Sequence, residues 1–137
     1  MTDDNRRANL LVEVEKSGNS QRAAEACLSL GLADDAVSRA YYAAYHMVQA
    51  LLLTEGLQAK SHAGLHDLFY LHFVRSGRLP THLAKLFAGL QKFREQADYT
   101  RAFHFSVEDA GEECAHSRAI CEALRALLVD GGWVDRG

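Results

Sequence analysis

The chain has 137 residues, of which 48% are hydrophobic and 24% charged, and its formal net charge is −3. These values predict one globular domain, residues 1–137, that is long enough to bury a core. No segment approaches the roughly 18 uncharged apolar residues of a membrane span, and the first ten residues lack the basic-then-apolar order of a secretory signal. The three cysteines include no CxxC pair, which argues against a disulfide framework or a zinc module. We therefore expect a cytoplasmic protein with no membrane segment.

The charges are unevenly distributed along the chain. Residues 75–101 carry six basic side chains (75, 78, 85, 92, 94 and 101) and two acidic ones, whereas residues 102–137 carry three basic and seven acidic ones. A locally basic segment in an acidic protein permits contact with phosphate groups without requiring it. An ordinary solvated surface is the alternative interpretation.

Glycine and capping residues predict the first two helices. The segment before Gly31 is helical in pattern, with residues 18–19 as a possible kink or break. Gly31 can end this first helix, and Asp34 or Asp35 can then serve as the N-cap of the next one. From there an Ala-, Leu- and Tyr-rich segment runs to Gly56, which predicts a helix of about 22 residues.

The second half of the chain contains three further helix signals. Ser61 can cap a third helix that ends near Gly77, and Pro80 suits the first turn of a fourth. Ser106, with acidic residues two and three positions later, can cap a last helix that closes at residues 131–132. Alternating β-branched runs and hairpin dipeptides are absent from the sequence. We predict an all-α, up-down bundle of four to five helices.

Two of these helices carry an apolar stripe at the 3-4 spacing that marks a core-facing side. In the second helix the stripe consists of Val37, Tyr41, Ala44, Val48 and Leu51. In the last helix it consists of Val107, Ala110, Cys114, Ser117, Cys121, Leu124 and Leu128. The two cysteines on this stripe are therefore predicted to be core residues.

A separate polar stripe follows the second helix. Arg39, Tyr42, His46 and Gln49 recur at i, i+3, i+7 and i+10. Burying such groups unpaired would cost about 1–3 kcal/mol each. We therefore expect the stripe to face a partner, which could be another helix, a second subunit or a ligand.

Two polar pairs at i, i+4 lie on later helices. Arg94 and Asp98 can form an ion pair, and the arginine is suited to fork-like contact with a carboxylate or phosphate. His62 and His66 have a spacing that can chelate zinc, but a zinc protease would carry Glu directly after the first His, where this chain has Ala63. The chain has neither a phosphate-binding glycine loop nor a GxSxG motif. We predict no metal and no cofactor.

Three stretches taken together resemble a known family. The order "DDAVSRAYYAAYHMVQALLLTEGL", "KSHAGL" and "LQKFREQADY" is similar to the small stand-alone branch of the HEPN domain superfamily. The resemblance extends from about residue 34 to the last helix. It implies a HEPN-like helical bundle that commonly dimerises and is often encoded beside a minimal nucleotidyltransferase. Several branches of the family are metal-independent ribonucleases, many of them toxins.

The ribonuclease branches carry a short motif on a late helix, an Arg followed by four to six residues and then a His. The resemblance implies that this His acts as general base or acid, while the Arg stabilises charge on the phosphate. Arg94 stands at the position of the motif arginine, but the fifth residue beyond it is Tyr99 and the next histidine is His104. Arg39 and His46 have the motif spacing, on the second helix instead.

The sequence leaves three functional hypotheses open. The first is a dimeric HEPN-type nucleotide- or RNA-binding module, the partner of a minimal nucleotidyltransferase in a toxin–antitoxin-like system. The second is a metal-independent ribonuclease in which Arg94 and His46 are catalytic. The third is a structural interaction bundle. The predicted nucleotide- or RNA-binding residues are Arg39, Tyr42, His62, Asp98 and Tyr99.

Overall fold

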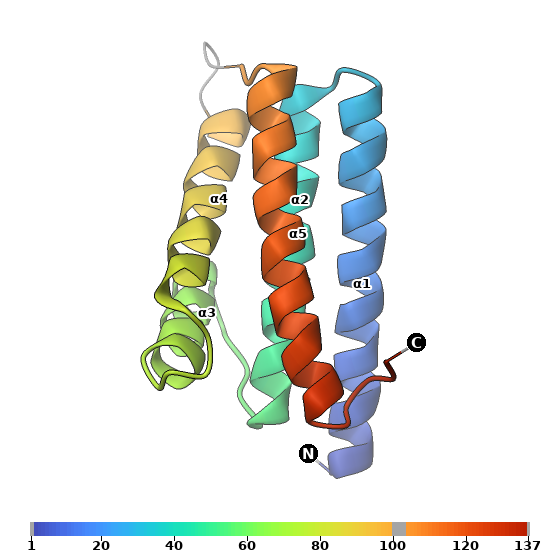
Figure 1. The fold of residues 1–137 in the computed structure, drawn as a ribbon, viewed down its shortest axis with the longest axis vertical. Coiled ribbons are helices and arrows are strands. Elements are labelled where there is room, and N and C mark those ends of the chain that lie inside the picture. The colour runs from blue at the N-terminus through green and yellow to red at the C-terminus, as the bar shows by residue number, and fades with distance from the viewer. Residues whose placement is uncertain (1, 100–103, 137) are drawn as a thin grey trace.

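The computed structural model describes residues 2–99 and 104–136. In these two stretches the chain forms helices and no strand (Figure 1), which confirms the predicted all-α bundle. The elements are α1 (Asp3–Ser29), α2 (Ala33–Thr54), α3 (His62–Phe69), the π-helical turn η1 (Tyr70–Val74), α4 (Thr81–Tyr99) and α5 (Val107–Asp130). Across the same stretches, no helix combines the length and the apolar character that crossing a bilayer requires.

Capping residues set several helix ends where the sequence predicted them. The Ser61 hydroxyl accepts a hydrogen bond from the backbone N–H of Gly64, and the Ser106 hydroxyl accepts one from that of Asp109. Each bond satisfies an N–H that the first helical turn leaves unpaired. Gly31, with φ of 75°, follows α1 in the left-handed conformation that glycine adopts without steric cost.

Three local predictions were wrong. α1 is continuous through residues 18–19, because packing along α2 outweighs the weak helix propensity of a single glycine. α2 begins at Ala33, so Asp34 lies inside its first turn, where the carboxylate accepts the backbone N–H of Phe105. Val107 is 44% exposed, since it is the first residue of α5 and lies beyond the buried stripe.

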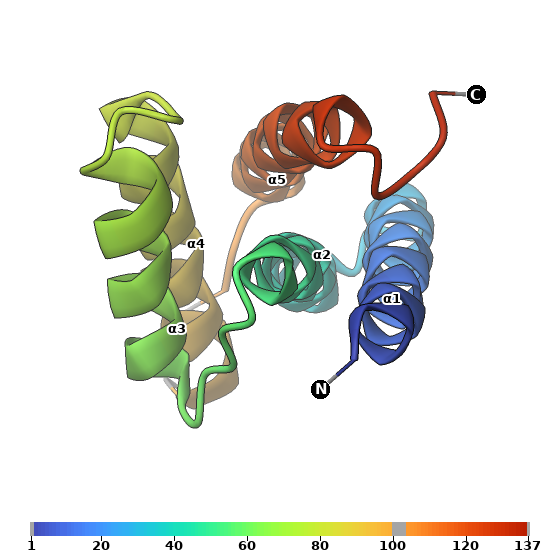
Figure 2. The ribbon, with the colours of Figure 1, turned by 90° about the horizontal axis from the view of Figure 1, so that it is seen from below.

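α2 is the central helix of the bundle. Seen from below in Figure 2, it is surrounded by α1, α5 and the α3–α4 pair. Its predicted apolar stripe is buried along the whole length: Val37, Tyr41, Ala44, Val48 and Leu51. Most of the predicted α5 stripe is buried too: Ala110, Cys114, Ser117, Leu124 and Leu128, while Cys121 is half-buried. The polar face of α2 is thereby directed away from the core.

Two buried serines attach the neighbouring helices to α2. The Ser17 hydroxyl of α1 donates to the backbone carbonyl of Ala43 at 2.7 Å, and the Ser117 hydroxyl of α5 donates to that of Ala40 at 2.6 Å. Small residues at these points let the helices approach closely, and the hydrogen bonds satisfy the buried hydroxyls. The two bonds help to hold the register of α1 and α5 along α2.

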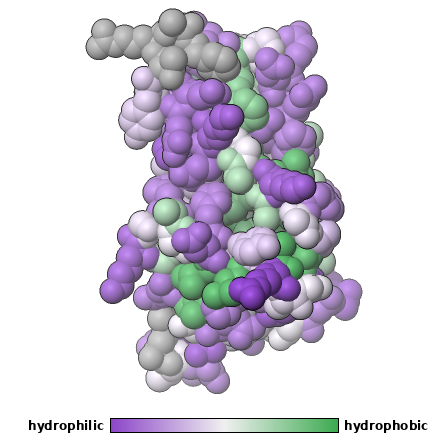
Figure 3. Space-filling model, turned by 90° about the vertical axis from the view of Figure 1, so that its left-hand side faces the viewer, coloured by the Kyte–Doolittle hydropathy of each residue, from purple (hydrophilic) through white to green (hydrophobic). Residues whose placement is uncertain are grey.

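The α3–α4 side of the bundle combines two kinds of surface. Its upper part in Figure 3 is largely hydrophilic, whereas hydrophobic side chains gather in the lower part. Leu71 of η1 is one exposed apolar residue of this side, at 47%. The third helix, predicted to end near Gly77, changes from α to π geometry after Phe69, and the chain turns at Gly77 with φ of 88°.

Candidate functional site

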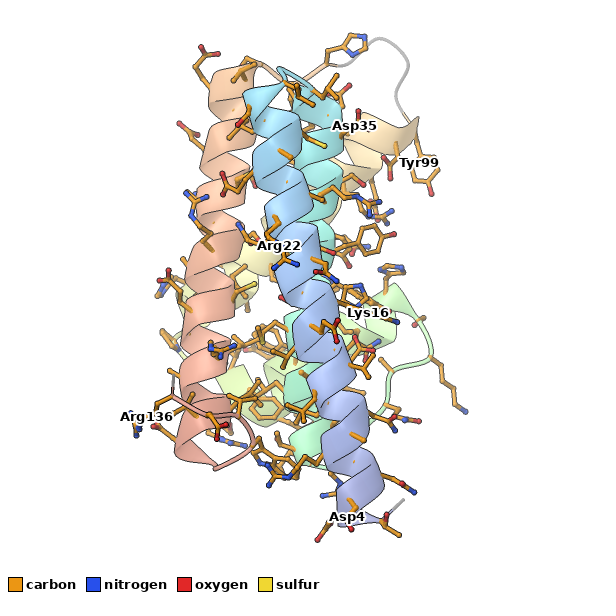
Figure 4. All side chains as sticks on the ribbon, turned by 90° about the vertical axis from the view of Figure 1, so that its right-hand side faces the viewer. Asp4, Lys16, Arg22, Asp35, Tyr99 and Arg136 are labelled. Carbon is orange, nitrogen blue, oxygen red and sulfur yellow. The ribbon has the colours of Figure 1, made fainter. Side chains whose placement is uncertain are left out.

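A pocket of about 600 Å³ lies where the start of α3 meets the second half of α4, and we call it the α3–α4 pocket. Its lining residues are His62, Gln91, Lys92, Arg94, Glu95, Gln96 and Tyr99. The lining itself contains two cations and one carboxylate, and the Asp98 carboxylate beside the pocket pairs with one of the cations, Arg94. Lys92 and Arg94 are the groups that can contact an anionic ligand. Both cations come from the predicted basic segment, of which Arg101 lies outside the described residues. Tyr99, labelled in Figure 4, projects from the end of α4.

Arg94 is the buried charge of this site, with 8% of its surface exposed. Its guanidinium carbon lies 5.1 Å from the centre of the Tyr41 ring and 5.6 Å from that of Tyr42. One guanidinium nitrogen donates to the Asp98 carboxylate at 3.2 Å and, at 3.5 Å, to the Tyr42 hydroxyl. The Nε–H finds no acceptor among the described residues. The guanidinium is thus held on two aromatic rings while part of its hydrogen-bonding capacity remains unused.

Beneath the pocket, a chain of hydrogen bonds runs from α4 to the buried Tyr41. The Gln91 side-chain N–H donates to the Glu95 carboxylate at 2.9 Å, so the Gln91 carbonyl oxygen faces His66 Nε2 at 3.1 Å. Since a carbonyl can accept but not donate, His66 carries its proton on Nε2. His66 Nε2 also lies 3.4 Å from the Tyr41 hydroxyl. This nitrogen therefore cannot accept the hydroxyl proton of Tyr41.

The same series of hydrogen bonds fixes the tautomer of His62. The Tyr41 hydroxyl lies 2.9 Å from His62 Nδ1, and since His66 does not take its proton, it donates to His62. Burial, together with the positive charge of Arg94, lowers the pKa of His62. Burial likewise lowers the pKa of His66. His62 is therefore neutral at pH 7 and presents Nε2–H to the pocket as a donor.

A second histidine on the polar face of α2 has the opposite arrangement. His46 Nδ1 lies 2.7 Å from the Glu13 carboxylate of α1, and both side chains are half-buried. Because an ionised carboxylate only accepts, Nδ1 carries the proton and the Nε2 of neutral His46 is left as an acceptor. A carboxylate that orients an imidazole in this way is a recurring feature of general bases.

The structure brings the two histidines and Arg94 into one aromatic cluster. The Tyr42 ring lies 6.4 Å from the His46 ring and 6.3 Å from the His62 ring, between centres. It also contacts the guanidinium groups of Arg94 and of the exposed Arg39, each at 5.6 Å. Four residues predicted from the sequence are thus neighbours of Tyr42, which was itself predicted. His46 itself is not among the residues that line the α3–α4 pocket.

Comparison with protein families agrees with this architecture. The family model described as "HEPN domain" matches residues 13–127. This chain belongs to the HEPN domain family. The matched region begins at Glu13 and contains every residue of the cluster described above.

Relatives of this HEPN domain occur in Thermotoga maritima and Methanocaldococcus jannaschii. It is 30% identical over 95 residues to a UPF0332 protein of Thermotoga maritima, covering 69% of this chain and 72% of that protein. It is 39% identical over 90 residues to "Putative toxin MJ0605" and 32% identical over 97 residues to "Putative toxin MJ0142", both of Methanocaldococcus jannaschii. These two alignments cover 66% and 71% of this chain. The chain spans 66% of each archaeal relative, just under two thirds of its length.

The two histidines of the site, His46 and His62, come from α2 and α3 and not from α4. Tyr99 occupies the place expected for the motif histidine, and it is 76% exposed at the mouth of the pocket. His104, the next histidine in sequence, lies 3.0 Å from the Asp34 carboxylate at the start of α2 and does not line the pocket. His62 is the histidine that shares the pocket with Arg94.

Several residues of the site were not predicted. Glu13 is 33 positions from His46, so no helical spacing connects them. Tyr41 was predicted as a core residue and is buried, but its hydroxyl also joins two histidines. The i, i+4 spacing of Gln91 and Glu95 was a usable local signal for their hydrogen bond. In the described residues, His62 and His66 belong to no group of three or more metal-ligating side chains.

Proposed function

We propose that this HEPN domain binds a nucleotide or RNA in the α3–α4 pocket, as the partner of a minimal nucleotidyltransferase in a toxin–antitoxin-like system. The observation that carries the proposal is Arg94, a buried guanidinium held on two tyrosine rings at the wall of an open pocket. Such a group suits fork-like contact with a phosphate. Lys92 adds charge, and His62 adds a neutral N–H donor.

The surroundings of Arg94 support a nucleotide over a simple inorganic anion. The half-buried rings of Tyr42 and Tyr45 and the exposed ring of Tyr99 lie beside the phosphate-binding groups. Nucleobases stack on aromatic side chains with little dependence on sequence. Two relatives carry the word toxin in their names, which supports the toxin–antitoxin setting. A cytoplasmic homodimer belongs to the same proposal, and light scattering on the purified protein tests the dimer.

Salt-dependent RNA binding tests the proposal. We expect Arg94→Ala to weaken the affinity for labelled tRNA by about 10–100-fold, since a hydrogen bond to a charged group contributes about 1.5–3 kcal/mol. The slope of log K against log salt should fall by about one. Lys85→Ala is the matched control, because Lys85 is exposed on α4 outside the pocket. Equal tRNA binding by wild type and Arg94→Ala would refute the α3–α4 pocket as the binding site. If no form binds tRNA, the structural interaction bundle is the remaining hypothesis.

The Glu13–His46 pair favours a second candidate, a metal-independent ribonuclease with Arg94 and His46 as its catalytic residues. His46 Nε2 would take the proton of a ribose 2′-hydroxyl, and the 2′-oxygen would attack the adjacent phosphorus. The bond from phosphorus to the 5′-oxygen then breaks, the 5′-oxygen takes a proton from water, and a 2′,3′-cyclic phosphate remains. Arg94 would stabilise the charge that develops on the phosphate.

Cleavage in EDTA separates the two candidates. Total RNA or tRNA is incubated with wild type, Arg94→Ala and His46→Ala, and the products are resolved by gel electrophoresis. Cleavage that disappears in both variants supports the enzyme. Binding without cleavage by wild type supports the binding module and rules out the ribonuclease.

A further inference from the structure

A second pocket lies beside the polar face of α2, on the side opposite to the α3–α4 pocket. It measures about 380 Å³ and is enclosed by α1, the last turns of α2 and the loop that follows, and we call it the α1–α2 pocket. The residues that decide its chemistry are Val12, Glu13, Lys16, Gln49, Leu53 and Gln58. Figure 4 labels Lys16 on α1, below Tyr99 in that view. No residue lines both this pocket and the α3–α4 pocket.

The composition of the α1–α2 pocket suits a nucleobase better than a phosphate. Val12 is 48% exposed and Leu53 is buried at 5%, so two apolar side chains contribute to a lining that is otherwise mostly polar. Lys16 and Gln58 have no hydrogen bond or ion pair within the described residues, which leaves their polar ends available. The Glu13 carboxylate is held by His46 and would repel a phosphate placed against it. A flat, uncharged ring with hydrogen-bonding edges meets all of these conditions.

Short contacts connect the two pockets across α2. The Gln49 side-chain N–H of the α1–α2 pocket donates to the Tyr45 hydroxyl at 3.0 Å. The Tyr45 ring lies 4.9 Å from the ring of His62, which lines the α3–α4 pocket. It also lies 5.5 Å from the ring of His46, the partner of Glu13. One aromatic side chain therefore separates the pocket that contains Arg94 from the pocket that contains Lys16.

We propose that the α1–α2 pocket is a second nucleotide subsite, which receives the base of the nucleotide next to the one whose phosphate Arg94 binds. The inference rests on the proposed function and narrows its substrate class to an oligonucleotide of at least two residues. The linking sugar and phosphate cross Tyr45, beside His46. Lys16 and Gln58 contact the edge of the second base, and Val12 and Leu53 contact its face.

Two small probes test the second subsite. They are AMP and the dinucleotide pApA carrying a 2′-O-methyl group on its first ribose, which prevents attack by the 2′-oxygen. Calorimetric titration of wild type should show pApA binding about tenfold or more tighter than AMP, the gain expected from one added base contact. Lys16→Gln and Gln58→Ala should each lower the pApA affinity toward that of AMP and leave AMP binding unchanged. Arg94→Ala should weaken both probes.

Matched variants and separate outcomes keep the inference distinct from the proposed function. Lys85→Gln removes the same charge as Lys16→Gln from an exposed position outside both pockets, so it controls for general attraction to a polyanion. If AMP binds through Arg94 but pApA binds no tighter, the second subsite is refuted and the proposed function stands. If Lys16→Gln and Lys85→Gln weaken pApA equally, the second subsite is refuted as well. If neither probe binds wild type although tRNA does, the second subsite is refuted and the proposed function stands; if tRNA does not bind either, both proposals are refuted.

Discussion

The two histidine regions of this site make different use of the same side chain. At the α3–α4 pocket, His62 accepts a hydrogen bond from Tyr41, so its outer nitrogen is a donor. On the other side of Tyr42, His46 donates to Glu13, so its outer nitrogen is an acceptor. The direction of one hydrogen bond at the inner nitrogen therefore decides what each ring offers to a ligand.

The two regions also differ in how a carboxylate is connected to the histidine ring. Glu13 of α1 contacts His46 of α2 directly, and both side chains are half-buried. Glu95 acts on His62 through three side chains, Gln91, His66 and the fully buried Tyr41. A relay that runs in this way from the exposed Glu95 to the buried Tyr41 stabilises the fold as well as the tautomer, because each polar group depends on the next. The direct pair can be altered with little effect on the core.

Tyr41→Phe is the largest expected perturbation, because it removes the buried hydroxyl that joins ring nitrogens of two half-buried histidines. We expect the free energy of unfolding to fall by about 1–3 kcal/mol, the cost of leaving such groups unpaired, as measured by urea denaturation. Tyr42→Phe is the matched control, since its hydroxyl has only a 3.5 Å contact with Arg94. Equal losses in the two variants would contradict the relay.

The relay should also make stability depend on pH. The pKa values of His62 and His66 are lowered in the folded state from the ordinary value of 6.5, so the unfolded chain binds protons first as the pH falls. Stability from these rings is therefore fully present above pH 6.5 and is lost as the pH drops toward their folded pKa values. The urea midpoint should decrease between pH 7 and pH 5. The decrease should be smaller in His66→Gln, and an unchanged dependence would contradict this assignment.

Glu13→Gln should break the direct pair while leaving the relay intact. A glutamine can donate as well as accept, so His46 loses its single preferred tautomer. Nitrogen-15 chemical shifts of the histidine rings measure the two tautomers. We expect the His46 signals to move toward a mixture while those of His62 stay constant, with less than about 1 kcal/mol of change in stability. Movement of both sets of signals would show that the two regions are coupled.

Asp98→Asn should produce the smallest effect. The Arg94–Asp98 pair is an i, i+4 ion pair whose carboxylate is 36% exposed, so its loss should cost at most about 0.5 kcal/mol of stability. Without the competing carboxylate, Arg94 should bind AMP about twofold more tightly. Weaker AMP binding would instead mean that Asp98 positions the guanidinium, and Asp98→Glu would then restore the affinity.

Local signals explain why much of the fold was predictable. Serine caps, glycines after helices and the spacing of apolar residues depend on neighbours within a few positions, and they located α2, α3 and α5. The Gly18 prediction was wrong because a helix propensity is a small local term that contact with α2 outweighs. Val107 was misplaced because periodicity shows the direction of a side chain but not where the core ends.

The sequence by itself determined the all-α class, the family resemblance, the buried stripe of α2 and the Arg94–Asp98 pair, because all of these follow from short-range spacing or from ordered motifs. The tertiary structure decided which histidine shares a pocket with Arg94, and it paired Glu13 with His46 and Tyr41 with His62. These partners lie 33 and 21 positions apart in the chain. Their contact depends on how far one packed helix is displaced along another, a quantity that no local pattern contains.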